Sequence, residues 1–329
     1  MVLMNARKDT SLNMTLDPKH TAFVFPGQGS QTVGMGKALV DSYPVARRVF
    51  EEADAVLGFP LSGLCWNGPE AELNETLNTQ PALLTHSIAA WRVLMDEAGE
   101  FQPLCVAGHS MGEFSALVAA GSLEFADALR LTRERGRVMT DAGKSKPGGM
   151  AAILNLDAAA LAEVCEQAAR ETGGIVNLAN DNCPGQIVIS GEVPALERAI
   201  ALALKRGAKR AIRLNVSIGS HSPLMDEAAR QFARAVDATP IADPKTPLIG
   251  NTAAAALHTA AELRVEVKAQ LTSPVRWTES VHAIAAMGAV LIVEFGPKDV
   301  LSCLIKRIDP QVRSLPAGTP EEIRTVLGV

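Results

Sequence analysis

Short apolar runs alternate with longer amphipathic stretches along most of this chain of 329 residues. Three such runs, each ending at or beside glycine or proline, predict buried strands at 21–25, 103–108 and 289–296. Continuous apolar runs suit strands that are covered on both faces, and helical patterns separate them here. We therefore expect an α/β domain built around a mostly parallel sheet.

A segment in the middle of the chain has a different order of elements. The stretch 141–149 is rich in glycine and lysine and has the composition of a linker. After it the pattern predicts strands at 148–154, 175–181, 186–191 and 209–216, with helices at 157–173 and 192–207. Cys183, Pro184 and Gly185 would form the turn between the two central strands. This β-α-β-β-α-β order is that of a ferredoxin-like fold, so we expect a small domain at 148–213 inserted into a larger domain made of 21–147 and 214–329.

Composition excludes several classes of protein. The formal net charge is −5, from 31 Lys+Arg and 36 Asp+Glu, which argues against a nucleic-acid binder. No apolar run has the length of a membrane span, and the polar residues 1–20 lack the core of a secretory signal, so we expect a flexible extension there. Five scattered cysteines without a CxxC pair argue against a disulfide framework or a metal site. We expect a cytoplasmic protein.

Ser110 is the candidate nucleophile. It lies in Gly108-His109-Ser110-Met111-Gly112, which matches G-x-S-x-G between a predicted strand and a helical stretch. A sharp strand-to-helix turn raises the serine hydroxyl above the sheet, and the first N–H groups of the helix can hold an oxyanion. The alternative is a glycine-flanked turn in which Ser110 only caps the helix.

A serine nucleophile needs a base, and His221 is the best placed of the six histidines. It follows a predicted strand at 214–218, and it precedes Ser222 and Pro223, which are typical of an N-cap and a first helical residue. His221 would then lie at the carboxyl end of a strand, where ligands collect in α/β sheets. The alternative is a turn histidine with a structural role.

Arg135 falls in the middle of the apolar face of a helix predicted from about 126 to 139. A guanidinium that points into a core is costly unless it is paired, and its planar fork fits a carboxylate. Arg135 would form either an internal ion pair with Asp or Glu or the binding site for a substrate carboxylate.

The glycine-rich loop 25–31 follows the first predicted strand. It is not a dinucleotide fingerprint, because Thr32 stands where G-x-G-x-x-G needs glycine, and Met35 stands where a phosphate-binding loop needs lysine. The loop either supplies a backbone N–H that faces Ser110, as the second half of an oxyanion hole, or is a simple tight turn.

Several segments occur in order between residues 23 and 277, and they are FPGQGSQTVGMG, AGHSMGEFSALVAAG, RLTRERG, NCPGQIVISG, VSIGSHSPLM, IGNTAA and QLTSPVRW. Together they resemble the malonyl-coenzyme A:acyl carrier protein transacylases, the stand-alone acyltransferases of type II fatty-acid synthesis. The resemblance covers nearly the whole chain after residue 20. It implies an α/β-hydrolase-like large domain with a mostly parallel sheet and an inserted ferredoxin-like small domain.

The resemblance also implies roles for individual residues, matched position by position. Ser110 would be the nucleophile and His221 the base. Arg135 would bind the malonyl carboxylate. The backbone N–H groups of Gln28 and Met111 would form the oxyanion hole.

Four further positions match the family. Gln270 would offer its backbone carbonyl to the second ring nitrogen of His221, in place of a triad acid. Asn180, Asn182 and Gln186 would line the cleft for the pantetheine and nucleotide of coenzyme A.

The implied reaction is ping-pong transfer of malonyl from malonyl-coenzyme A to the phosphopantetheine thiol of acyl carrier protein. Malonyl-coenzyme A would be a substrate, with no cofactor, and the protein would be a monomer. Three alternatives stay open: an α/β serine esterase or thioesterase, the same transfer serving polyketide or malonate-decarboxylase carrier proteins, and a module that binds acyl-coenzyme A without chemistry.

Overall fold

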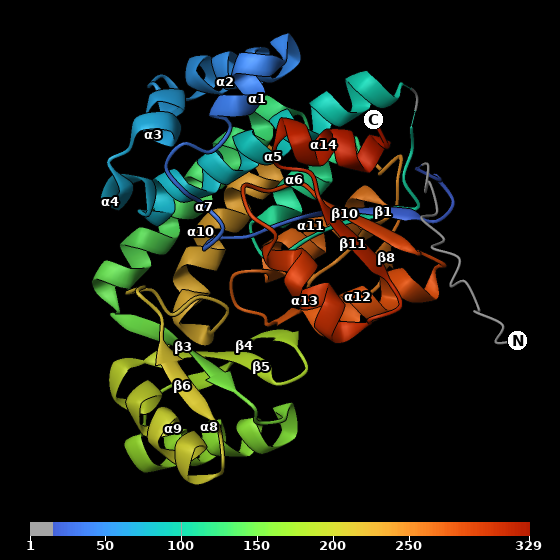
Figure 1. Cartoon of the computed structure of the whole chain (residues 1–329). Coiled ribbons are helices and arrows are strands. Elements are labelled where there is room, and N and C mark those ends of the chain that lie inside the picture. Colours follow the sequence, from blue (N-terminus) through green and yellow to red (C-terminus); the bar gives the residue numbers. More distant parts are fainter. Residues whose placement is uncertain (1–15, 100) are drawn as a thin grey trace, which may run out of the picture.

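The large domain is organised around a six-stranded sheet (Figure 1). The computed structural model describes residues 16–99 and 101–329. The strand order is β11-β10-β1-β2-β7-β8, and every neighbouring pair is parallel except β7 and β8. The strands are β1 (Thr21–Phe25), β2 (Cys105–Gly108), β7 (Leu248–Ile249), β8 (Ala256–Leu257), β10 (Leu291–Glu294) and β11 (Arg313–Pro316). The predicted mostly parallel α/β fold is confirmed, and β1, β2 and β10 match the three predicted strands.

Helices bury both faces of this sheet. Alternate residues of β1 join two separate apolar clusters, with Phe23 and Phe25 on one face and Ala22 and Val24 on the other. The first cluster includes α1 (Lys37–Ser42), α2 (Pro44–Leu57), α3 (Leu61–Asn67), α4 (Glu70–Leu73), α5 (Thr76–Ala98), α6 (Gly112–Ala119), α7 (Phe125–Ser145), η1 (Pro223–Met225), α10 (Asp226–Ala238), α11 (Ala260–Ala269) and α14 (Pro320–Leu327). The second includes α12 (Trp277–Ala286) and α13 (Val300–Ile308). None of the described helices has the length and apolar character of a membrane span.

The small domain has the predicted β-α-β-β-α-β order. Its elements are β3 (Gly148–Leu154), α8 (Ala158–Thr172), β4 (Val176–Cys183), β5 (Gln186–Glu192), α9 (Val193–Lys205) and β6 (Arg210–Arg213). The order β6-β3-β5-β4 is antiparallel throughout. A fifth strand, β9 (Val275–Arg276), comes from the large domain and pairs with β4 in parallel. The sheet of the small domain therefore includes residues beyond 148–213.

The predicted strand at 214–218 is wrong. Strand β6 ends at Arg213, and the chain then runs irregularly to η1. Leu214 and Val216 turn inward while Asn215 and Ser217 are exposed, so the residues alternate as in a strand. The regular pairing with β3 nevertheless ends at Arg213, and after it the Leu214 N–H donates to the Met150 carbonyl oxygen at 2.9 Å without a continuing ladder. His221 is therefore not placed by the end of a strand.

Smaller differences concern the ends of elements. Cys183 belongs to β4 rather than to the following turn, and α7 continues to Ser145, into the predicted linker. Of the predicted extension 1–20, residues 1–15 lie outside the described part. His20 is already fixed to the large domain, because its Nδ1 lies 2.9 Å from the Gly288 carbonyl oxygen.

Candidate active site

Ser110 lies at a sharp turn between β2 and α6. Its φ of 51° is in the left-handed region, which costs energy for a residue with a side chain. The turn is possible because glycines flank it: a Cβ on Gly112 would lie 2.1 Å from the Phe25 carbonyl oxygen, and one on Gly108 would lie 2.0 Å from the Gly112 carbonyl carbon. The predicted strand-turn-helix context of Ser110 is present.

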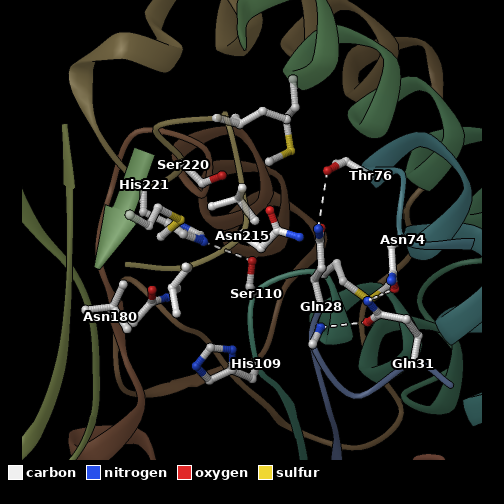
Figure 2. Close-up of a pocket in the computed structure, with 18 of the residues that line it drawn as sticks. Gln28, Gln31, Asn74, Thr76, His109, Ser110, Asn180, Asn215, Ser220 and His221 are labelled. Atoms are coloured by element: carbon white, nitrogen blue, oxygen red, sulfur yellow. Dashed lines mark hydrogen bonds between the residues drawn. The ribbon is translucent and has the colours of Figure 1, made fainter. Parts of the chain in front are cut away.

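The structure brings Ser110 and His221 into contact. Ser110 Oγ lies 2.9 Å from His221 Nε2, although the two residues are 111 positions apart (Figure 2). On the other side of the ring, His221 Nδ1 lies 2.9 Å from the carbonyl oxygen of Gln270 and 3.0 Å from that of Ser273. Carbonyls only accept, so Nδ1 carries the proton and Nε2 presents its lone pair to the serine hydroxyl.

The surroundings of His221 favour the neutral ring. Burial, followed by the positive charge of Arg135, lowers the pKa of His221 to about 3, while the carbonyls of Gln270 and Ser273 act in the opposite direction. A neutral imidazole with a free Nε2 lone pair is the form that can take a proton from Ser110. The Ser273 carbonyl was not predicted from the sequence.

Arg135 is buried in α7, with 2% of its surface exposed. Its Nη1 donates to Gln80 Oε1 at 2.9 Å and its Nη2 donates to Ser110 Oγ at 3.2 Å. Within the described residues Arg135 forms no ion pair with an acid, and its Nε has no partner. Burial lowers the pKa of Arg135 to about 10, so the guanidinium remains charged at neutral pH. A buried cation with an unused donor beside the nucleophile is suited to an anionic group.

Two backbone N–H groups near Ser110 are free to bind an oxyanion. The N–H of Ser110 itself donates to Asn251 Oδ1 at 2.7 Å, so it is occupied. The N–H groups of Gln28 and Met111 have no acceptor among the described residues, and both residues line the cavity at Ser110. The loop of Gln28 lies against the turn of Ser110, since a Cβ on Gly27 would lie 2.6 Å from the His109 carbonyl oxygen.

The cavity above Ser110 has a volume of about 410 Å³ and lies between the two domains (Figure 2). The large domain contributes Ser110, Arg135 and His221, and the small domain contributes Asn180 and Asn182. Its remaining lining includes apolar side chains: Met139, Met150, Val188, Leu214, Val216 and Ile218. The rest of the lining is polar and includes Gln28, Gln31, Asn74, Thr76, Asn215 and Ser220. A pocket that combines an apolar wall with convergent polar groups is typical of a substrate site.

The three amide side chains predicted for the cleft have different positions. Asn180 lines the cavity, and Asn182 Oδ1 accepts a hydrogen bond from Nε2 of His109 at 2.8 Å. Gln186 does not line this cavity. Its Oε1 accepts from Arg307 Nη1 at 2.9 Å, because β5 begins at Gln186, beyond the part of the sheet that faces Ser110. The structure therefore brings all predicted site residues together except Gln186.

Sequence reasoning missed several residues that hold the site. Asn251 fixes the Ser110 N–H, and Gln80 holds Arg135. Glu113, directly after the serine motif, is a completely buried acid in an apolar helix. The signal that identified Arg135, a charge on an apolar face, was also present for Glu113.

Among the described residues no group of His, Cys, Asp and Glu side chains could hold a metal ion.

Residues 22–314 match the family model described as acyl transferase domain. The malonyl CoA-acyl carrier protein transacylase of Bacillus subtilis (strain 168) is 45% identical to the chain, over 93% of this chain and 96% of the relative. The corresponding protein of Escherichia coli (strain K12) is 44% identical, over 93% of this chain and 98% of the relative.

Solved structures agree with these relatives. The malonyl CoA-acyl carrier protein transacylase of Coxiella burnetii superimposes with a TM-score of 0.91 at 41% identity, and the match covers 94% of this chain and 98% of that chain. A complex of a type II polyketide synthase acyl-carrier protein with its malonyl-transacylase gives a TM-score of 0.91 at 41% identity, with 94% and 99% coverage.

Proposed function

The chain belongs to the acyl transferase family, and on this premise we propose that it transfers malonyl from malonyl-coenzyme A to the phosphopantetheine thiol of an acyl carrier protein. One observation carries the proposal: a serine hydroxyl, a neutral imidazole and a buried guanidinium meet in one cavity. Ser110 Oγ lies 2.9 Å from His221 Nε2 and 3.2 Å from Arg135 Nη2.

The first half-reaction forms an ester on Ser110. His221 Nε2 takes the hydroxyl proton as Ser110 Oγ attacks the thioester carbonyl, and the N–H groups of Gln28 and Met111 hold the resulting oxyanion. The carbon–sulfur bond then breaks. The proton on His221 passes to the departing coenzyme A sulfur, which leaves as the thiol.

The second half-reaction reverses these steps with another thiol. His221 Nε2 takes the proton of the phosphopantetheine thiol, whose sulfur attacks the ester carbonyl of malonyl-Ser110. The bond to Ser110 Oγ breaks, and His221 returns the proton to the serine. One thioester replaces another, so we expect transfer to run in both directions.

Arg135 would bind the free carboxylate of malonyl. Its Nη2 already contacts Ser110 Oγ, so an acyl group of three carbons on this oxygen has its far carboxylate within reach of the guanidinium. Gln80 holds Nη1 and fixes the plane of the fork. A carboxylate that reaches Arg135 pairs a buried cation that otherwise has no acid partner among the described residues.

The orientation of His221 favours acyl transfer over the esterase alternative. An α/β serine esterase uses an Asp or Glu to hold the histidine, whereas His221 Nδ1 meets the carbonyls of Gln270 and Ser273. A neutral acceptor orients the ring without placing a second charge beside it.

Trapping the ester tests the proposal. Incubation with malonyl-coenzyme A should add one malonyl group to the intact protein, located on Ser110 by peptide mass spectrometry, and acyl carrier protein should remove it. The Ser110→Ala variant should show no such adduct. An adduct on another residue, or hydrolysis of malonyl-coenzyme A that outpaces transfer, would contradict the assignment.

We further propose a cytoplasmic monomer that needs no cofactor and serves fatty-acid synthesis. All five cysteines are free thiols, which suits a reducing compartment. The chemistry above draws only on side chains and backbone groups of this chain. Size-exclusion chromatography with light scattering tests the monomer. Comparison of kcat/KM for fatty-acid and polyketide carrier proteins tests the assignment to a pathway.

A further inference from the structure

Glu113 is a buried acid that the proposed reaction does not use. It lies in the first turn of α6, three residues after Ser110, and is completely buried. Glu113 forms no ion pair within the described residues. Burying a carboxylate without a cation is costly, so the hydrogen bonds that compensate it must be strong and well placed.

Every group that contacts the Glu113 carboxylate is a donor. Oε1 accepts from the backbone N–H of Asn251 at 3.1 Å and from Asn251 Nδ2 at 3.4 Å. Oε2 accepts from Gln270 Nε2. The oxygen and nitrogen of the Gln270 amide cannot be exchanged, because Nε2 also donates to the Ser110 carbonyl oxygen at 2.9 Å and an oxygen at that position could not. The environment matches an ionised carboxylate that only accepts.

The same two partners hold the nucleophile and the base. Asn251 Oδ1 accepts from the Ser110 N–H, and Gln270 Nε2 donates to the Ser110 carbonyl, so both backbone polar groups of the strained residue are fixed. The backbone carbonyl of Gln270 accepts from His221 Nδ1. One carboxylate therefore links the backbone of Ser110 to the group that orients His221.

We propose that Glu113 is a positioning residue, which holds Ser110 and His221 at the distance and orientation needed for proton transfer through Asn251 and Gln270. The acid of a serine–histidine–acid triad contacts the histidine directly. Here the acid lies one layer further back, behind two amide side chains. The meaning of this arrangement for acyl transfer rests on the proposed function.

The charged groups around this network come from several elements. Burial, the largest effect, and Glu266 on α11 raise the pKa of Glu113 well above its usual range, whereas the hydrogen bonds from Asn251 and Gln270 and the charge of Arg135 on α7 lower it. Burial, the charge of Arg135 and, to a smaller extent, His109 lower the pKa of His221. In its ionised form Glu113 offsets the buried charge of Arg135 and favours the imidazolium that forms when His221 accepts the serine proton.

The test compares two buried acids. Glu113→Gln keeps the size of the side chain but turns one of its oxygens into a donor that faces another donor. Glu294→Gln is the matched control, because Glu294 is also buried and accepts from two backbone N–H groups, of Leu301 and Ser302, at the start of α13. Each variant is assayed for the rate constant of Ser110 acylation at saturating malonyl-coenzyme A, with thermal unfolding measured in parallel.

We expect Glu113→Gln to slow acylation at least tenfold and Glu294→Gln to leave it within twofold of wild type. Affinity for malonyl-coenzyme A, measured in the Ser110→Ala background, should be the same with Glu or Gln at position 113. The proton resonance of His221 Nδ1–H should shift in Glu113→Gln only. Acylation of Glu113→Gln within twofold of wild type, or an equal loss in both variants, would overturn the proposal.

A fluorophosphonate probe separates this inference from the proposed function. It labels a serine activated by histidine whatever the natural acyl group is. A wild-type protein that reacts with the probe but forms no malonyl ester would refute malonyl transfer, and slower labelling of Glu113→Gln would still support the role of Glu113. If Glu113→Gln does not fold, Gln270→Ala serves instead, since it keeps the backbone carbonyl. Labelling of Gln270→Ala at least tenfold slower than wild type supports the network, and a smaller loss refutes it.

Discussion

Burial determines the protonation state of the two side chains that face Ser110. It removes water from His221 and lowers its pKa to about 3, which leaves the ring free to accept a proton. It also lowers the pKa of Arg135, but only to about 10, so the guanidinium stays charged. One environment therefore provides a neutral base and a permanent cation within hydrogen-bond distance of the same hydroxyl.

Replacing Arg135 should change the choice of acyl group. We expect Arg135→Ala to lower kcat/KM for malonyl transfer by about 100-fold, which corresponds to about 3 kcal/mol for a buried charge-assisted pair. Acetyl transfer should be unchanged or faster, because acetyl has no carboxylate to bind. Parallel transfer assays with malonyl- and acetyl-coenzyme A measure both values.

The matched control for this prediction is Arg137→Ala. Arg137 lies on the same helix, but it is exposed and pairs with Glu134 and Asp141. Its loss should leave both activities within about twofold of wild type, as is usual for surface ion pairs. Equal losses of malonyl and acetyl transfer in Arg135→Ala would remove the carboxylate-binding role of Arg135.

The pH dependence of acylation follows from the depressed pKa of His221. The base must be neutral, so protonation of His221 slows acylation only as pH drops through the folded pKa of this ring, which is about 3. We expect kcat/KM for ester formation to be flat from pH 8 to about 5.5, with intrinsic fluorescence confirming that the protein stays folded. A fall centred near 6.5, the ordinary histidine value, would show that the ring is not desolvated in solution.

The residues that could be predicted carry a local signal. Ser110 lies in a short motif, and Arg135 interrupts an apolar face. Asn251 and Gln80 lack such a signal, because their importance comes from contacts with Ser110 and Arg135 across 141 and 55 positions. Gln186 was assigned by position in the family alone, and the structure places its side chain against Arg307 instead.

Among the secondary-structure elements, the turn from β2 to α6 has the tightest steric requirement. The backbone of α6 approaches the end of β1 so closely that any side chain on Gly112 would overlap Phe25. This approach also brings the loop of Gln28 beside Met111, the two residues whose N–H groups we propose as the oxyanion hole. The geometry of catalysis and the packing of the sheet are thus set by the same contact.

Gly112→Ala should therefore lower both stability and activity. The new Cβ would lie 2.1 Å from the Phe25 carbonyl oxygen, and backbone cannot yield as a flexible side chain does. We expect a loss of about 3 kcal/mol in the free energy of unfolding, measured by urea denaturation, together with loss of ester formation.

Gly63→Ala is the corresponding control. Gly63 lies inside α3, and the nearest atom to a new Cβ there is Pro60 Cβ at 3.8 Å, an ordinary contact. Alanine favours the helix, so we expect stability to be unchanged or up to about 1 kcal/mol higher. A Gly112→Ala protein as stable and active as wild type would contradict the close approach of α6 to β1.

Strands of the central sheet were predictable, whereas the connections to the small domain were not. In the run 21–25, residues 22–25 are all apolar because both faces of the strand are buried. Residues 214–218 alternate because one side faces the cavity, a pattern that a strand would also show. Strand β9 has only two residues, which is too short for a hydrophobic periodicity to predict it. It is a strand because the tertiary structure places it beside β4.

In the molecule as a whole, the cavity at Ser110 is formed where the two domains meet. Ser110, His221 and Arg135 belong to the large domain, whereas Asn180 and Asn182 come from the small one. The pairing of β4 with β9 and the bonds of Arg307 to Gln186 and to the Pro184 carbonyl tie the domains together. These ties fix the position of Asn180 and Asn182 relative to Ser110 across the cavity.

Buried histidines should make the stability of the whole molecule fall in acid. His86 is completely buried in α5, and burial lowers its pKa to about 4, below the value of 6.5 expected for the unfolded chain. The unfolded state therefore binds more protons between these values, and stability present above pH 6.5 is lost as pH falls towards about 4. His86 alone accounts for about 3 kcal/mol of this loss.

His86→Leu isolates this contribution, because leucine is apolar and does not titrate. Glu294 opposes the trend: burial raises its pKa to about 7, so its protonation stabilises the fold as pH falls from 7 to 4.5. The titrations of Glu294 and His221 are the same in wild type and in His86→Leu, so their contributions cancel when the two proteins are compared. We expect urea unfolding to show a loss between pH 7 and pH 5 that is about 2 kcal/mol smaller in His86→Leu than in wild type. Equal losses would mean that His86 gains a proton in the folded state at little cost, and that the interior around α5 is open to water.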